Sequence, residues 1–372
     1  MARILALRFL FSICVILTGA QELFAQRRTE NVVLVTLDGA RRQEIFGGLD
    51  RDILKSTAGT APVESLAVYK EYWADTPEER RRKLMPFFWG TLMERGSIAG
   101  NQSLGSTARV TNAHWFSYPG YSEILTGEAH DDVIKSNDAM QNPFETVLEF
   151  VKRKIGLPTS KVAAFASWGV FSGIVEHTPG AIVSNAGTQR LESTDPLVRQ
   201  VSDLQFEVQM PWDQIRSDAF TFRLAMAYMK TQKPRLMYLA LDETDDWAHD
   251  GKYGLVLKSL ARSDRYLQEL WEWIESDPQY QGKTTIVLTT DHGRGNTIAD
   301  WRSHGKDIEG AQYIWAAVAG PDTSLRGEWR DAGAVSQNQI AATIARLFGL
   351  DLSELRPSAG QPISAFWDPA DR

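Results

Sequence analysis

The chain has 372 residues, of which 43% are hydrophobic and 23% are charged, as in an ordinary soluble globular protein. Its formal net charge is −7 at pH 7, and no basic stripe runs along it, which argues against a nucleic-acid backbone as its main partner. Cys14 is the one cysteine. A mature chain without it has no disulfides and no thiol chemistry.

The first 25 residues have the pattern of a secretory signal peptide. Arg3 and Arg8 lead into the apolar run LFSICVILTGA, and Ala25 offers a small residue at which cleavage can occur. A membrane anchor is the alternative, but this run is shorter than the ~20 residues that span a bilayer. We therefore expect an exported protein, periplasmic or extracellular, with no membrane span once residues 1–25 are removed.

Apolar runs alternate with helical patterns along the rest of the chain. The runs typical of buried parallel strands lie at 31–37, 161–167, 235–241, 284–290 and 313–320. Helical patterns begin after Thr76, where proline and acids follow a capping residue, and cover about 143–155, 212–230, 252–277 and 336–348. This alternation predicts an α/β fold, a mostly parallel central sheet with helices on both faces. No repeat or linker divides residues 26–372, so we expect one domain.

Acidic residues follow three of these predicted strands. Asp38 ends the first run, Asp242 and Asp245 follow the run at 235–241, and Asp291-His292 ends the run at 284–290. Ligands of open α/β sheets bind beyond the carboxyl ends of the strands. Three strands thus deliver metal-binding side chains to one edge, although an Asp-Gly pair such as Asp38-Gly39 also favours a turn.

Histidines accompany the acids at informative spacings. Asp245 and His249 are four residues apart, which puts both side chains on one side of a helical turn. Asp242 and Asp246 are alternative acids. His304 lies twelve residues after His292 in RSHG, either as a third imidazole or as a loop residue.

The order of these motifs resembles the alkaline phosphatase superfamily, most closely its nucleotide pyrophosphatase/phosphodiesterase branch. SYPGYSEILTG at 117–127 is similar to TFPNHYxxxTG of the phosphodiesterases, with Ser117 in place of the threonine. Asn137 lies twenty residues after Ser117, as does an asparagine of that branch. The short distance from His292 to His304 is instead similar to the cofactor-independent phosphoglycerate mutase branch. Residues 48–85 form an insertion relative to the compact family pattern.

This resemblance implies two divalent metal ions. The metal ligands that it implies are Asp245, His249 and His304 for the first ion and Asp38, Asp291, His292 and Ser117 for the second. Three histidines favour zinc, and manganese is the alternative.

The resemblance also implies roles in catalysis and substrate binding. Ser117 would be the nucleophile and form a phospho-serine, with Ser122 as the alternative hydroxyl inside the following helix. Asn137 and backbone amides near Tyr118 would bind nonbridging oxygens. The cationic candidates for substrate binding are Arg294, Arg302 and Lys306. The insertion and the aromatics Trp115, Phe116, Tyr118, Trp247 and Trp301 could line a pocket for a nucleoside or aryl group.

The predicted function is an exported two-metal hydrolase of small-molecule phosphoesters, of phosphodiesterase or nucleotide pyrophosphatase type. A phosphomutase, a phosphomonoesterase and a metal-binding protein without turnover are the alternatives. A sulfatase is disfavoured because Tyr121 stands where that class has arginine. No phosphate-binding glycine loop of a kinase or NTPase follows a strand.

Overall fold

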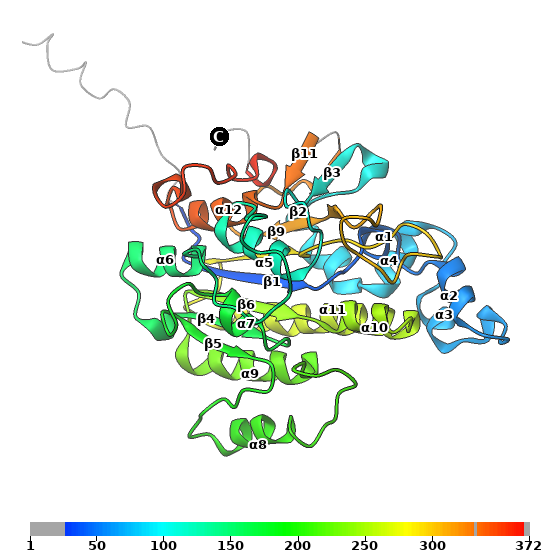
Figure 1. Cartoon of the computed structure of the whole chain (residues 1–372), viewed down its shortest axis with the longest axis horizontal. Helices are drawn as coiled ribbons and strands as arrows, with labels where there is room; N and C mark the ends of the chain where they lie inside the picture. Colours follow the sequence, from blue (N-terminus) through cyan, green and yellow to red (C-terminus); the bar gives the residue numbers. More distant parts are fainter. Residues whose placement is uncertain (1–26, 331–332, 368–372) are drawn as a thin grey trace, which may run out of the picture.

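The computed structural model describes residues 27–330 and 333–367, so the expected signal peptide lies outside the described residues. An eight-stranded sheet forms the centre of the molecule (Figure 1). Its strands, in spatial order, are β10 (Gly327–Glu328), β2 (Gly96–Ala99), β9 (Ala316–Ala319), β7 (Thr284–Thr289), β1 (Asn31–Leu37), β6 (Leu236–Leu241), β4 (Val162–Ala166) and β5 (Val183–Ala186). The strands from β7 to β5 are parallel, whereas β9 is antiparallel to both its neighbours. The predicted mostly parallel sheet is confirmed.

The last apolar run is divided between two sheets. Residues 313–320 form β8 (Tyr313–Ile314) and β9, separated by the fully buried Trp315. β8 belongs to a second, three-stranded sheet with β3 (Ser106–Arg109) and β11 (Gly333–Ser336). Both halves are apolar, so composition did not reveal that they pair with different strands.

β1 contributes side chains to two separate cores. Val33, Val35 and Leu37 pack into one core, and Val32 and Leu34 pack into the other. Successive side chains of a strand point to opposite faces of the sheet. Both faces of β1 are therefore covered, which explains its nearly continuous apolar sequence.

Helices cover both faces of the sheet, as predicted (Figure 1). One face is covered by α5 (Ser117–Thr126), α6 (Val147–Ile155), α7 (Phe171–Ile174) and α12 (Gln339–Leu347). The other is covered by α4 (Pro77–Leu84), α9 (Asp218–Gln232) and α11 (Tyr253–Ser276). Helix α9 begins later than the predicted 212, because the preceding segment forms a loop in which Trp212 packs on Trp247.

Several helices, including α4, lie in excursions of the chain between strands. Residues 48–85 form α2 (Arg51–Thr57), α3 (Ala67–Tyr72) and α4, which follow α1 (Arg42–Gly47). The hydroxyl of Tyr253 in α11 accepts the amide hydrogen of Asp50, 2.9 Å away, and so attaches this excursion to the framework. Helix α8 (Pro196–Leu204), which comes between β5 and α9 in the chain, projects beyond α9 at the bottom of the view (Figure 1). Among the described residues, no helix combines the length and apolar character needed to cross a membrane.

Candidate active site

Three neighbouring strands bring the predicted ligands to one edge of the sheet. β1 lies between β7 and β6. Asp38 follows β1 directly, α10 (Glu243–His249) follows β6, and Asp291 and His292 follow β7. Parallel strands end at the same edge, so these segments, which are far apart in sequence, converge there.

One cluster contains the side chains predicted to hold the second metal. Nε2 of His292 lies 3.5 Å from Oδ1 of Asp38 and 3.3 Å from Oδ2 of Asp291. Oγ of Ser117 lies 3.4 Å from the same His292 nitrogen. Both of these carboxylate oxygens are buried and have no hydrogen-bond partner among the described residues. Unpaired buried carboxylate oxygens are costly, so this donor set fits a divalent cation.

Burial and neighbouring charges act on these acids. Burial, followed by the charge of Asp291, raises the pKa of Asp38 well above its usual value. Burial also raises the pKa of Asp291. Each carboxylate is therefore difficult to ionise in this buried site, and a bound cation would reverse this effect by stabilising the charged forms.

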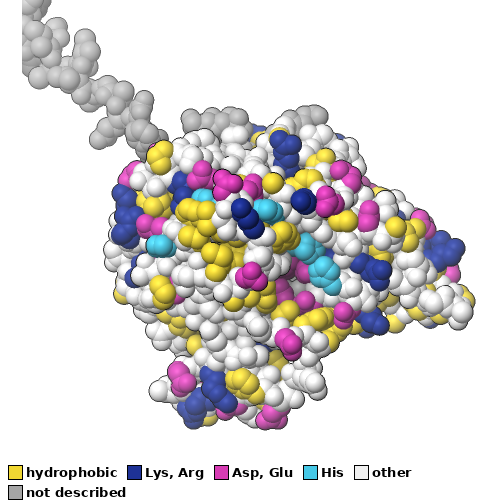
Figure 2. Space-filling view, in the orientation of Figure 1, with side chains coloured by type: hydrophobic (Ala, Val, Ile, Leu, Met, Phe, Trp, Pro, Cys, Tyr) yellow, Lys and Arg dark blue, Asp and Glu magenta, His cyan; other side chains and the backbone are white. Residues whose placement is uncertain are grey.

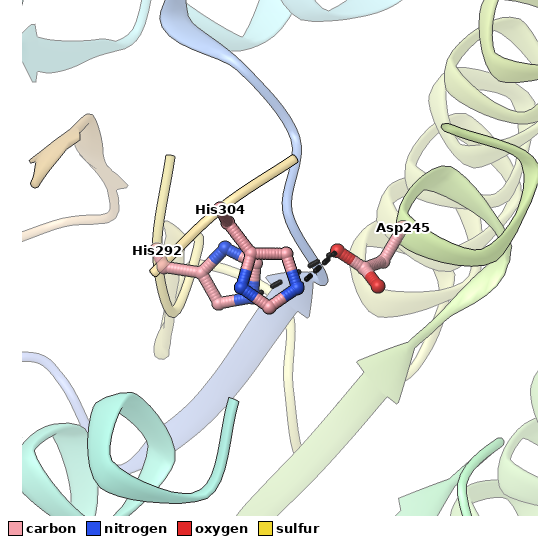
Figure 3. Close-up of side chains that lie close together, drawn as sticks. All are labelled: Asp245, His292 and His304. Atoms are coloured by element: carbon pink, nitrogen blue, oxygen red, sulfur yellow. Dashed lines mark ion pairs between the residues drawn. The ribbon is translucent and has the colours of Figure 1, made fainter. Parts of the chain in front are cut away.

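A second cluster contains the side chains predicted to hold the first metal. Nε2 of His249 lies 3.0 Å from Oδ2 of Asp245 and 3.0 Å from Nε2 of His304. His292 and His304 both face Oδ1 of Asp245, at 3.8 and 3.9 Å (Figure 3). His292 therefore borders both clusters, whereas the sequence interpretation gave it to the second metal alone.

The histidines of this cluster are suited to metal binding. Burial, followed by the proximity of His292, lowers the pKa of His304 to about 2, so its ring is neutral and retains a lone pair for a metal. The side chain of His249 is 47% exposed. On the face shown in Figure 2, histidine side chains lie at the surface beside acidic ones. The alternative acids Asp242 and Asp246 belong to neither cluster of facing ligand atoms within residues 27–330 and 333–367.

Two residues that the sequence interpretation missed hold the acids in place. The hydroxyl of Tyr121 donates to Oδ2 of Asp38 at 2.8 Å, and Nε2 of Gln337 donates to the backbone oxygen of Asp291 at 2.6 Å. Tyr121 lies one helical turn after Ser117, so its spacing carried a usable signal. Gln337 comes from the distant segment before α12, and no local pattern marks it.

Gly39 permits the close approach of the two acidic segments. Its φ is +56°, and an added Cβ would lie 2.3 Å from Oδ1 of Asp245. Its amide donates to Oδ1 of Asp291 at 3.0 Å. Glycine is thus required by both the backbone conformation and the available space.

The segment before α5 positions Ser117, which is the first residue of that helix. Glu123 accepts hydrogen bonds from the amides of Thr111 and Asn112, each at 2.9 Å. Oδ1 of Asn112 accepts the amide hydrogen of Trp115, also at 2.9 Å, where φ is +57°. A left-handed conformation is unfavourable for a non-glycine residue and persists only where its surroundings hold it. Ser122, the alternative hydroxyl, is buried inside α5.

Asn137 lies beside the first turn of α5. Its Oδ1 accepts the amide hydrogen of Tyr118 at 2.9 Å, so the twenty-residue spacing does bring Asn137 next to Ser117. The amide of Tyr118, expected to bind substrate, is engaged by this bond. Its ring is fully buried, and its hydroxyl donates to the backbone oxygen of Met140 at 2.9 Å.

Burial of two of the named aromatic side chains makes the expected aromatic pocket smaller than the sequence suggested. Trp301 is 2% exposed and packs edge-on against Tyr253, so it belongs to the core, as Tyr118 does. Tyr69 and Trp73 of the 48–85 excursion stack on each other, with their ring centroids 5.2 Å apart. Of the named aromatics, Trp115, Phe116 and Trp247 retain partial exposure.

The predicted cationic residues differ in their surroundings. Arg294 is 1% exposed and donates hydrogen bonds to the carboxylate of Asp245 and to its backbone oxygen. Burial alone would raise the pKa of Asp245, but Arg294 and His249 lower it well below its usual value. This burial differs from the substrate-facing position expected for Arg294. Arg302 and Lys306 are exposed on the loop that carries His304.

Residues 108–360 match the family model described as type I phosphodiesterase / nucleotide pyrophosphatase. The chain belongs to this family. The match includes the segments of Ser117, Asp245, Asp291 and His304 but begins after Asp38. No curated protein sequence matches the chain significantly.

Solved structures with alkaline-phosphatase-like folds resemble this family member. The alkaline phosphatase PafA gives a TM-score of 0.57 at 10% identity, with 92% of this chain and 99% of PafA covered. The lipoteichoic acid synthase LtaP from Listeria monocytogenes gives a TM-score of 0.56 at 11% identity, with 92% of this chain and 76% of LtaP covered. The phosphonate monoester hydrolase SpPMH from Silicibacter pomeroyi gives a TM-score of 0.56 at 13% identity, with 92% of this chain and 78% of SpPMH covered. At these identities the likeness establishes the fold.

Proposed function

We propose that this protein is an exported, two-metal phosphoester hydrolase of phosphodiesterase type that acts through a phospho-serine. The observation that carries the proposal is the convergence of Ser117 Oγ with His292, Asp38 and Asp291, where Oγ lies 3.4 Å from Nε2 of His292. Family membership supports the reaction class. Residues 26–372 would form one catalytic domain after removal of the signal peptide.

Two clusters of ligands would hold the metal ions. The first ion would be held by Asp245, His249 and His304, and the second by Asp38, Asp291, His292 and Ser117. Three imidazoles among these ligands favour zinc, with manganese as the alternative. Two divalent ions supply positive charge for the attacking and leaving oxygens of an in-line displacement.

The residues around Ser117 suit nucleophilic attack. In the proposed step Ser117 loses its hydroxyl proton to solvent and Oγ forms a bond to phosphorus, while the leaving oxygen departs with the electron pair of the broken ester bond and takes up a proton from water. Ser117 begins a ten-residue helix, α5, whose positive dipole end lies where a phosphoryl group would bind. The side-chain amide nitrogen of Asn137 would donate to a nonbridging oxygen. Water then hydrolyses the phospho-serine.

The surroundings of this site favour a diester over a monoester. A diester has one fewer negative charge on its nonbridging oxygens and a second ester group that needs space. The buried guanidinium of Arg294 is bound to Asp245, while Trp115, Phe116 and Trp247 remain partly exposed. An aryl or nucleotide diester therefore fits these residues better than the matching monoester.

The decisive experiment compares one leaving group in diester, monoester and sulfate-ester form. We expect the highest kcat/KM for the diester, with water as the final acceptor. A monoester preference would overturn the diester assignment. The short His292–His304 spacing keeps a phosphomutase as the second candidate, and phosphoryl return to a substrate hydroxyl without net phosphate release would support it. If a metal-loaded sample turned over none of these esters, the result would support the alternative of a metal-binding protein without catalytic activity.

A further inference from the structure

One buried guanidinium connects three segments that carry candidate metal ligands. Arg294 lies two residues after His292. Its Nη2 donates to both the carboxylate and the backbone oxygen of Asp245, the latter at 3.0 Å. Its Nη1 donates to the backbone oxygen of Arg302, two residues before His304. The loop after β7, helix α10 and the loop that carries His304 therefore meet at one side chain.

These bonds also orient the carboxylate of Asp245. Arg294 binds Oδ1, while Oδ2 lies 3.0 Å from Nε2 of His249. The same nitrogen, Nη2, also binds the backbone oxygen of Asp245, while Nη1 binds Arg302, so the planar guanidinium is held on both sides and fixes the position of Oδ1 relative to α10. Oδ2 of Asp245 is thereby directed to the histidine with which it would share an ion.

Arg294 has little freedom to leave this position. It is 1% exposed, and an added Cβ on Gly39 would lie 2.9 Å from its Nε, so the loop after β1 packs closely against it. An arginine that contacts substrate needs an exposed face, which Arg294 lacks. Its bonds described above all run to protein segments that carry candidate metal ligands.

We propose that Arg294 is a positioning residue for the first metal site, which holds Asp245 and the His304 loop in register, and not a substrate clamp. This inference rests on the proposed metal-dependent function. It gives the guanidinium of Arg294 the role of holding the metal ligands in place, whereas the proposed reaction takes place at Ser117.

The test measures zinc binding by chelator-stripped protein, in competition with a chromophoric chelator, for wild type, Arg294→Lys and Arg294→Met. We expect wild type to bind two ions. Both variants should retain one site and bind at the other about 10- to 100-fold more weakly, the usual loss when an outer partner of a ligand is removed. In a His249→Ala background, the Arg294 change should add little further loss, because both changes act on the same site.

Arg216→Met is the matched control. Arg216 is also 1% exposed, but its guanidinium binds Asn185 and Thr221, neither of which is a candidate ligand. The Arg216→Met change should lower thermal stability while leaving two zinc sites of wild-type affinity. If Arg294→Met does not fold, Arg294→Lys, which keeps the buried charge, decides the question.

Three results would overturn the positioning role. The first is wild-type zinc affinity in the Arg294 variants. The second is tighter zinc binding in Arg294→Met, which would reveal charge repulsion between Arg294 and the ion, and the third is a raised KM with unchanged metal occupancy, which would indicate a substrate clamp. If wild-type protein bound no zinc or manganese, the proposed metal-dependent function would fail, independently of Arg294.

Discussion

At the scale of single residues, two serines of α5 differ in what surrounds them. Ser117 Oγ lies 3.4 Å from His292 Nε2 at the candidate metal cluster. Oγ of Ser122 is buried inside the helix and has no hydrogen-bond partner among the described residues. A hydroxyl becomes a useful nucleophile only when a base or metal favours its alkoxide, so the position of Ser117 favours it over Ser122 as the proposed nucleophile.

We predict that Ser117→Ala lowers kcat for the best ester substrate by at least about 1000-fold, as removal of a nucleophile does in other covalent mechanisms. Metal content and thermal stability should change little, because Asp38, Asp291 and His292 remain to hold the second ion. Ser122→Ala, in the same helix, is the control and should retain most turnover. Wild-type turnover in Ser117→Ala would refute covalent catalysis by this serine.

Tyr121 is a second residue whose neighbours suggest a specific test. Its hydroxyl donates to Oδ2 of Asp38 at 2.8 Å and so orients a candidate ligand. Tyr121→Phe should weaken metal binding at the second site about 10-fold or more, since removal of a ligand's outer partner has this effect. Zinc titration of chelator-stripped protein measures it.

Tyr118→Phe is the control, because Tyr118 is equally buried in α5 but donates to the backbone oxygen of Met140. Both variants lose one buried hydrogen bond, which costs roughly 1 kcal/mol of stability. Equal zinc affinity in the two variants would show that the Tyr121 bond does not tune the metal site.

At the scale of elements, buried acids hold the beginnings of neighbouring segments in place by accepting their backbone amide hydrogens. Asp218, at the start of α9, accepts the amide hydrogens of Asp242 at 2.9 Å and Glu243 at 3.2 Å. It therefore anchors the N-terminal end of α10, which carries Asp245 and His249. Asp264 of α11 does the same for the segment after α4, where it accepts the amides of Phe87 at 3.0 Å and Phe88 at 2.7 Å.

Asp264 makes stability depend on pH. Burial raises its pKa from 3.8 to about 6, against the hydrogen bonds from Phe87 and Phe88. A folded-state pKa above the unfolded value gives stability that is present below pH ~4 and lost as pH rises through ~6. The shift corresponds to roughly 3 kcal/mol.

The pH effect is measured as a difference between wild type and Asp264→Asn, whose amide does not titrate. The unfolding free energy of wild type relative to the variant should fall by about 3 kcal/mol from pH 4 to 7 and then remain level. Urea unfolding at several pH values gives this difference, in which titrations common to both proteins cancel. A difference independent of pH would contradict the role assigned to Asp264.

At the scale of the whole molecule, the strand order β7-β1-β6 assembles the site. The acids lie at the carboxyl ends of three adjacent parallel strands, and α5, from the helical layer that also contains α6, α7 and α12, supplies Ser117. Asp38 and Asp291 are separated by most of the chain, yet both lie within 3.5 Å of one nitrogen of His292. A bound cation would therefore link distant segments and stabilise the whole fold.

We predict about two transition-metal ions per chain, measured by elemental analysis of purified protein. A ligand at 1000 times its dissociation constant stabilises the folded state by about 4 kcal/mol, so chelation should lower the melting temperature and abolish turnover. Readdition of zinc or manganese should restore both. Metal-free protein with full, chelator-resistant activity would refute the metal-dependent mechanism.

The sequence alone determined the fold class and the positions of most candidate ligands. Buried parallel strands have continuous apolar runs, and Asp38, Asp245 and Asp291 follow three of them, so local pattern and one rule about strand ends sufficed. His249 and Asn137 were also found from the sequence, by their distances along the chain from Asp245 and Ser117.

Tertiary structure decided what depends on partners distant in sequence. It divided residues 313–320 between two sheets, buried Tyr118 and Trp301 in the core, and brought Tyr121 and Gln337 to the acids. It also placed Arg294 on Asp245, where the sequence suggested a contact with substrate. A side chain's type shows what it is able to bind, but packing between segments far apart in the chain determines which partner it meets.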